Sequence, residues 1–208
     1  MNTTTEIDPK LVKQLREKTN AGFMDCKRAL VESGGDLAQA ETILRTKGIA
    51  SAGKKASRVT REGIVASYIH LQGKVGVLVE VNCETDFVAR NENFREFVKD
   101  ITLHIAAAHP LYVNRADVPG NLIEAEREIY KAQVKDKPAH VADKIVDGKL
   151  EKFYSTVCLL EQAFIKNPDV TIGDLLNAKI AELGENVVIR RFVRYLVGES
   201  LQTSSDSL

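Results

Sequence analysis

Near residue 63 the spacing of the apolar residues changes from that typical of helices to that typical of strands. Before this point, apolar side chains recur every three or four residues in three short blocks. From Gly63 to Cys83 they alternate instead, and the valines of 75–81 share one strand face. This pattern predicts an α+β fold, with an N-terminal three-helix module followed by a small antiparallel β-sheet core packed with helices.

Residues 1–48 are expected to form the three-helix module. Residues 20–22 (NAG) separate its first two helices, and residues 33–36 (SGGD) supply a helix stop and then an N-cap for the third. Residues 49–61 are rich in Gly, Ala, Ser and basic residues and show no apolar face. Such a composition predicts a flexible or partly helical linker.

Residues 62–199 are expected to form the α+β core. A hairpin at 63–83, turning at 72–74, would pair with a C-terminal strand rich in β-branched and aromatic residues. The predicted elements after the hairpin are helices at 92–108, 121–153 and 171–183 and that strand at 186–197. Residues 200–208 are polar and without apolar periodicity, which predicts a disordered tail.

Composition excludes several classes of partner. With 29 basic and 29 acidic residues, the chain lacks the positive excess that phosphate backbones require, so we expect no direct nucleic-acid partner. Neither a targeting segment nor an apolar run of membrane-spanning length is evident, and we expect a cytoplasmic protein with no membrane partner.

Cofactor and metal sites are not expected either. The three cysteines are odd in number, far apart and outside any CxxC pair, which argues against disulfides or a zinc site and predicts free buried thiols. No Gly-rich loop carries the lysine and spacing of a phosphate-binding loop, so the chain itself should not bind GTP.

Two motifs resemble the elongation factor Ts family. Residues 11–48 resemble its ubiquitin-associated-type helical module, through the pattern Arg-x-x-Thr-x-Ala-Gly-x-Met-Asp-Cys-Lys-x-Ala-Leu at 16–30. The segment VNCETDFVARN at 81–91 resembles the family's Thr-Asp-Phe-Val-Ala motif, and weaker likeness extends the match from residue 11 to 199. The resemblance implies a guanine-nucleotide exchange factor for the translational GTPase elongation factor Tu, and not an enzyme.

The second motif supplies the first set of candidate partner-binding residues. By resemblance, Phe87 is a wedge at the magnesium-binding side of the GTPase's nucleotide site, with Asp86 pairing at the same face and Thr85 and Val88 beside it. Magnesium tolerates distorted ligand geometry poorly, so a wedge there would loosen the nucleotide. The alternative is that Phe87 fills the core beneath its own hairpin, while Asp86 merely favours a helix N-terminus after Thr85.

The first motif supplies the second set. By resemblance, Arg16, Phe23 and Met24 contact the outer helix of the GTPase domain, with the two apolar residues in a loop. The alternative is that Phe23 closes the helix bundle, Met24 fills a gap and Arg16 faces water.

His104 is the last candidate. At about 100° per residue it lies roughly 60° from the centre of its helix's apolar stripe, where it could border both core and partner. By resemblance it meets the GTPase near its switch region. The alternative is a surface histidine whose hydrogen-bonding groups are satisfied and which contacts no partner.

The length of the chain also bears on assembly. The longest family members carry a second core subdomain and a protruding helical hairpin, both of which this chain is expected to lack. Short relatives form homodimers, and the resemblance therefore implies a homodimer and a two-plus-two complex with elongation factor Tu.

Two further hypotheses compete with nucleotide exchange, which is the first. The first three helices alone would suit a ubiquitin-binding or general helical adaptor, which leaves the 81–91 motif unexplained. A third hypothesis is an enzyme with Cys83 as nucleophile and His70 or His104 as base. Cys83 continues the inward face of the valine strand, which favours an inert buried thiol instead.

Overall fold

The structure is a computed structural model that describes residues 7–19 and 21–199, so the predicted tail at 200–208 lies outside the described residues. In chain order the elements are α1 (Pro9–Thr19), α2 (Phe23–Glu32), α3 (Leu37–Lys55), β1 (Glu62–His70), η1 (Leu71–Gly73), β2 (Val75–Cys83), α4 (Asp86–Arg90), α5 (Glu92–Ala108), η2 (Arg115–Asp117), α6 (Gly120–Ala132), α7 (Ala139–Val157), η3 (Leu159–Glu161), β3 (Ala163–Phe164), β4 (Asn167–Thr171), α8 (Ile172–Leu183) and β5 (Val187–Leu196). The predicted α+β class is confirmed.

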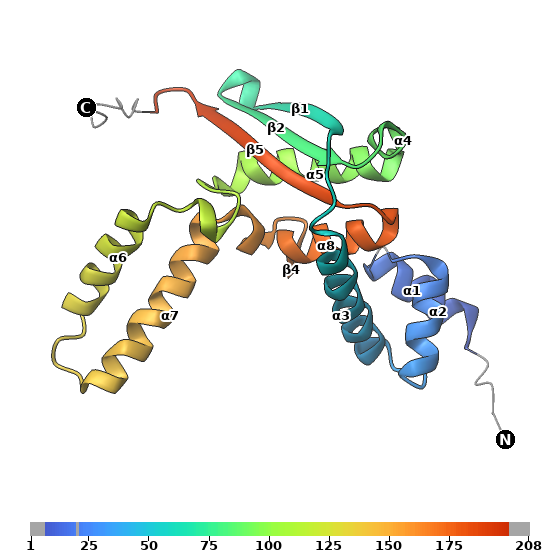
Figure 1. Cartoon of the computed structure of the whole chain (residues 1–208), viewed down its shortest axis with the longest axis horizontal. Helices are drawn as coiled ribbons and strands as arrows, with labels where there is room; N and C mark the ends of the chain where they lie inside the picture. Colours follow the sequence, from blue (N-terminus) through green and yellow to red (C-terminus); the bar gives the residue numbers. More distant parts are fainter. Residues whose placement is uncertain (1–6, 20, 200–208) are drawn as a thin grey trace.

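A three-stranded antiparallel sheet, in the order β1-β2-β5, forms the upper layer of the molecule in Figure 1. Helix α5 lies directly beneath it and packs on the face of β2 that carries the buried alternating valines, and α8 lies below α5. A β-bulge shifts the β2–β5 register between Glu80 and Val81. Gly63 allows β1 to approach β2, because a Cβ there would lie 2.2 Å from the carbonyl oxygen of Val81.

The first three helices pack around Leu15, Cys26 and Leu30, all of which are fully or almost fully buried. Helix α3 starts at the predicted N-cap, where the Asp36 side chain accepts a hydrogen bond from the Gln39 backbone N–H at 2.9 Å. Sequence patterning did not predict how far this helix extends.

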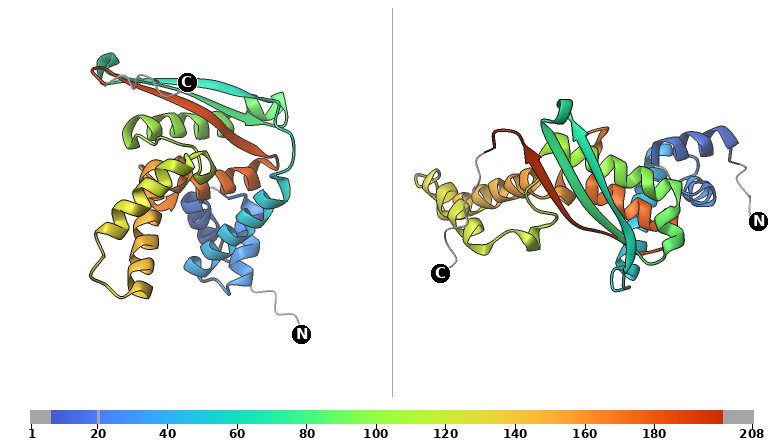
Figure 2. Two further views of the ribbon diagram at one scale, coloured as in Figure 1. Left: turned by 60° about the vertical axis from the view of Figure 1, so that its left-hand side comes forward. Right: turned by 90° about the horizontal axis from the view of Figure 1, so that it is seen from above.

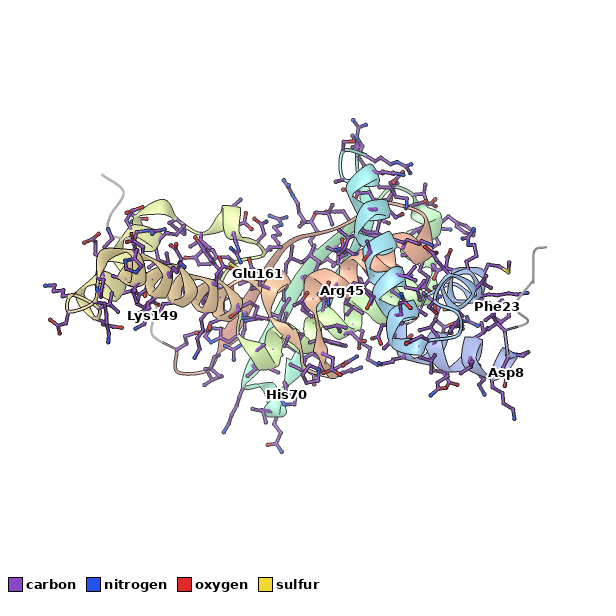
Figure 3. The ribbon with its side chains drawn as sticks, turned by 90° about the horizontal axis from the view of Figure 1, so that it is seen from below. Asp8, Phe23, Arg45, His70, Lys149 and Glu161 are labelled. Atoms are coloured by element: carbon purple, nitrogen blue, oxygen red, sulfur yellow. The ribbon has the colours of Figure 1, made fainter. Side chains whose placement is uncertain are left out.

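Helix α3 continues to Lys55, so much of the predicted linker at 49–61 is helical. It packs along α8, and Arg45, labelled in Figure 3, forms two hydrogen bonds with Asp174 at 3.0 and 2.8 Å. Small residues, Gly48 and Ala52, are buried on this side and let the two helices approach closely. The extension has no apolar stripe because its buried residues are small, and their burial depends on a helix far away in the sequence.

The predicted single helical region at 121–153 is instead two antiparallel helices, α6 and α7, joined through residues 133–138. They project away from the sheet and from α1–α3, as Figures 1 and 2 show. The expectation that this chain lacks a protruding helical hairpin was therefore wrong. Val134, Val146 and Leu150 give this hairpin a small apolar core of its own, so its helices pack on each other rather than on the sheet.

The hairpin is fixed at its base by Arg115. The guanidinium donates two hydrogen bonds to Glu151, at 2.8 and 2.6 Å, pairs with Glu161, and lies 4.5 Å from the centre of the Tyr154 ring. Figure 3 shows Glu161 at the junction with the core and Lys149 farther out on α7.

None of the helices within 7–19 and 21–199 is both long and apolar enough to cross a bilayer.

Candidate protein-binding site

Phe87 is the most exposed large apolar side chain in the described part of the chain, with 78% of its surface accessible to solvent. It lies on the short helix α4, between the end of β2 and the start of α5. The alternative in which Phe87 fills the core is therefore wrong. An exposed aromatic ring is typical of residues that anchor a protein partner.

The local sequence explains why the ring points outward. The Thr85 hydroxyl caps α4 by accepting the Val88 backbone N–H at 3.3 Å, and Val88 and Ala89 are buried in the core beneath the sheet. A single helical turn that buries these two residues leaves Phe87 on the opposite side. The expected contact of the Val88 side chain with a partner was thus wrong, because that side chain anchors α4 to the core.

Two charged side chains lie beside Phe87. Asp86 and Arg90 are both exposed and form an ion pair at 2.9 Å, one helical turn apart. Exposed pairs of this kind contribute little to stability, and either partner is free to exchange for a charge on another protein. The Phe87 ring is therefore flanked by two charged groups that can pair with charges on the surface of a partner.

The second candidate surface lies on the N-terminal helices. Phe23 and Met24 are 50% and 59% exposed, and Arg16 is exposed on α1. Phe23 begins helix α2 instead of lying in the predicted loop, and Figure 3 shows it at the outer side of the helices. The alternative in which Phe23 closes the bundle and Met24 fills a gap does not match this exposure.

Both surfaces lie at the same end of the molecule. In Figure 1, α4 and the α1–α2 pair are on the right, one above the other, whereas α6–α7 extends to the left. The view from above in Figure 2 gives the same separation. One partner could therefore contact both surfaces without touching the hairpin.

His104 is not part of this surface. Its side chain is fully buried, with Nε2 3.0 Å from Gln162 Oε1 and Nδ1 accepting the Ile165 backbone N–H at 3.4 Å. Burial lowers the pKa of the imidazole, while the bond to Gln162 acts in the opposite direction. The expected partner contact was wrong because η3 and the β3–β4 hairpin, which were not predicted, cover this flank of α5.

The arrangement also argues against a cysteine nucleophile. Cys83 is fully buried, and burial raises the pKa of its thiol to about 11, so little thiolate forms near neutral pH. His70 lies at the far end of the β1–β2 ladder, where it pairs with Val75 while Cys83 pairs with Glu62. Neither His70 nor the enclosed His104 is placed to act as its base.

Sequence reasoning missed the residues that hold the Phe87 loop. The carboxylate of Glu185 accepts hydrogen bonds from the backbone N–H groups of Glu84 and Thr85, each at 3.1 Å, and from the Thr85 hydroxyl at 2.7 Å. Gly184, in the left-handed conformation with φ 75°, ends α8 just before it. That glycine is a sequence signal for the end of α8. It does not indicate what Glu185 contacts, because the Phe87 loop lies about a hundred residues earlier in the chain.

An exposed aromatic ring, flanking charges and a second apolar surface at the same end define a protein that acts by binding another protein. Comparisons with known proteins show the family of the chain. The model of the family "Elongation factor TS" matches residues 52–199. The chain is 59% identical over 197 residues to elongation factor Ts of Carboxydothermus hydrogenoformans, covering 94% of this chain and 91% of that protein.

It is also 57% identical to elongation factor Ts of Thermoanaerobacter sp. (strain X514), covering 96% of this chain and 99% of that protein. With elongation factor Ts of Citrifermentans bemidjiense it shares 58% identity, over 91% of this chain and 89% of the relative. The chain belongs to the elongation factor Ts family, and its role is in translation elongation.

Proposed function

We propose that this chain is a guanine-nucleotide exchange factor for elongation factor Tu and acts in the cytoplasm. In this proposal Phe87 enters the GTPase beside the magnesium-binding side of its nucleotide site, and Asp86 and Thr85 contact the same face. The observation that carries the proposal is the 78% exposure of Phe87 on a helix whose next two residues are buried. Displaced magnesium ligands would weaken GDP binding, because magnesium requires nearly octahedral coordination.

The energetics require a second contact. Accelerating release by a factor of ~10⁴ needs about 5.5 kcal/mol of preference for the nucleotide-free GTPase. Burying one phenylalanine side chain supplies only roughly 1.5–3 kcal/mol. We therefore assign the second contact to Arg16, Phe23 and Met24, which would bind the outer helix of the GTPase domain. Helix α3, which packs on α8, would keep the two contacts at a fixed separation.

The effects of the factor and of nucleotide on each other's binding must also be reciprocal. If the factor weakens nucleotide binding, nucleotide weakens binding of the factor by the same free energy. Incoming GTP would thus release the factor and complete the cycle.

The test is release of labelled GDP from elongation factor Tu in stopped flow, with and without the chain. We expect a large acceleration and a stable complex with the nucleotide-free GTPase that added GTP dissociates. Unchanged release would reject the exchange function. Capture of ubiquitin in place of the GTPase would support the alternative, a ubiquitin-binding or general helical adaptor.

We further propose that the chain is a homodimer, which would give a two-plus-two complex with elongation factor Tu. Within the described residues, the helices lie on one side of the three-stranded sheet, as Figures 1 and 2 show. The strand register places five exposed apolar side chains on its other face. These are Val65, Ile69, Leu78, Val193 and Tyr195. Two such faces can stack around a two-fold axis, as in a β-sandwich, with the Glu80–Arg191 ion pair at 2.7 Å beside the apolar patch.

The dimer proposal predicts a change in oligomeric state. Leu78 lies in the central strand and is 47% exposed, so Leu78→Lys should leave the fold intact but place a charge within the interface. In analytical ultracentrifugation the unmodified chain should sediment as a dimer and the variant as a monomer. Ile129→Lys on α6, which alters a side chain of similar exposure away from the sheet, is the control and should remain dimeric. A monomeric unmodified chain would reject the proposal.

A further inference from the structure

The Phe87 loop begins where the sheet stops. Pairing between β2 and β5 ends at Cys83 and Val187, so the next backbone N–H groups, of Glu84 and Thr85, have no strand to bond to. The Glu185 carboxylate accepts both of them at 3.1 Å. A side chain thus continues the hydrogen bonding that the sheet no longer provides.

The bonding runs in both directions between the two loops. The carboxylate of Glu84, on the Phe87 loop, bonds to the segment that carries Glu185: its Oε1 accepts the Asn186 backbone N–H at 2.6 Å. The buried Asn186 side chain in turn donates to the carbonyl oxygens of Ala56, at 3.4 Å, and Arg58, at 2.9 Å. The chain leaving α3, the Phe87 loop and the start of β5 are therefore tied together at one place.

The bond to the Thr85 hydroxyl links this junction to α4. The hydroxyl donates to Glu185 Oε1 at 2.7 Å, which orients its lone pairs, and accepts the Val88 N–H that opens α4. A helix of five residues has little stability of its own. Its direction, and therefore that of Phe87, depends on this cap and on the buried residues that follow the ring.

We propose that Glu185 is a positioning residue for nucleotide exchange: it fixes the loop at 84–85 and so presents Phe87 in the orientation that the partner requires. This inference rests on the proposed function. Without the carboxylate, the loop and α4 would become ordered only when the partner binds, and the lost conformational entropy would weaken binding. In the intact chain this order is already present after folding. Losing this order should reduce the acceleration of GDP release by roughly three- to tenfold.

A double-mutant cycle tests whether Glu185 acts through Phe87. Glu185→Ala alone should lower the acceleration, but should cause no further loss when combined with Phe87→Ala. Glu185→Gln keeps one carbonyl acceptor for the two backbone N–H groups and should restore part of the activity. Equal losses in both backgrounds, or full activity of Glu185→Ala, would overturn the inference.

Glu182→Ala is the matched control. Glu182 lies three residues earlier, and its carboxylate bonds to Asn93 and Lys179, each at 2.7 Å, without touching the Phe87 loop. Its loss should lower stability to a similar extent while leaving exchange unchanged. Exchange lost equally in Glu182→Ala and Glu185→Ala would indicate a general structural role and overturn the inference.

A spectroscopic measurement observes the positioning directly. The chain contains no tryptophan, so Phe87→Trp introduces a single indole at the wedge position. Adding Glu185→Ala should lower the residual fluorescence anisotropy of that indole, whereas adding Glu182→Ala should not. Unchanged anisotropy would contradict the inference. If the unmodified chain does not accelerate GDP release, the proposed function fails instead, whatever Glu185 does.

Discussion

Phe87→Ala is expected to slow GDP release from elongation factor Tu in the presence of the chain by roughly ten- to a hundredfold. The substitution removes the ring that the proposal places in the GTPase, and with it roughly 1.5–3 kcal/mol of burial free energy. Because the ring is 78% exposed in the free chain, its removal should change the free energy of unfolding by no more than about 0.5 kcal/mol. Stopped-flow release of labelled GDP and thermal unfolding measure the two effects separately.

A matched control uses another exposed apolar side chain. Ile129 is 50% exposed on α6, at the end of the molecule away from α4. Ile129→Ala should therefore release GDP at the rate of the unmodified chain. Normal exchange by Phe87→Ala would remove the ring from the mechanism, and equal losses in both variants would show that exposed apolar surface acts without regard to position.

Phe94→Ala is expected to have the opposite profile, with a large loss of stability. Phe94 lies one helix later, on α5, and is fully buried between that helix and the sheet. Emptying the site should cost about 3–5 kcal/mol, from lost burial and from the cavity left behind. For a chain of this size, that corresponds to a fall of roughly 6–20 °C in the melting temperature.

The pair of phenylalanines makes this test sharp, because the same substitution is made at two sites seven residues apart. Calorimetry should show the lower melting temperature for Phe94→Ala alone. At a temperature where Phe94→Ala remains folded, its exchange activity should stay close to that of the unmodified chain. A melting temperature unaffected by Phe94→Ala would mean that the core beneath the sheet is not packed as described.

Much of the fold could be predicted from local patterns. The helix expected at 92–108 is α5, with Asn91 capping it, and the strand expected at 186–197 is β5 with one residue fewer at each end. These elements carry their own apolar periodicity and end signals. The bulge in the β2–β5 pairing has no such signal, because it arises from how two strands far apart in the sequence meet.

The candidate site divides in the same way. The motif at 81–91 made Phe87 and Asp86 candidates for partner binding, but did not reveal which neighbouring side chains face inward. Val88 was assigned to the surface because a pattern of five residues does not reveal the direction of a single helical turn. His104 was misplaced because its covering segments, η3, β3 and β4, are only 3, 2 and 5 residues long, too short to show an apolar periodicity.

The sequence by itself determined the α+β class, the order of the main elements and the residues that resemble the family, since periodicity, caps and motifs are properties of neighbouring residues. Only the tertiary structure decided that Phe87 projects, that α3 runs on against α8, and that α6 and α7 form a hairpin of their own. It also brought Glu185 to the Phe87 loop. These features depend on contacts between segments up to 129 residues apart, and whether a side chain is buried at such contacts depends on the whole packed structure.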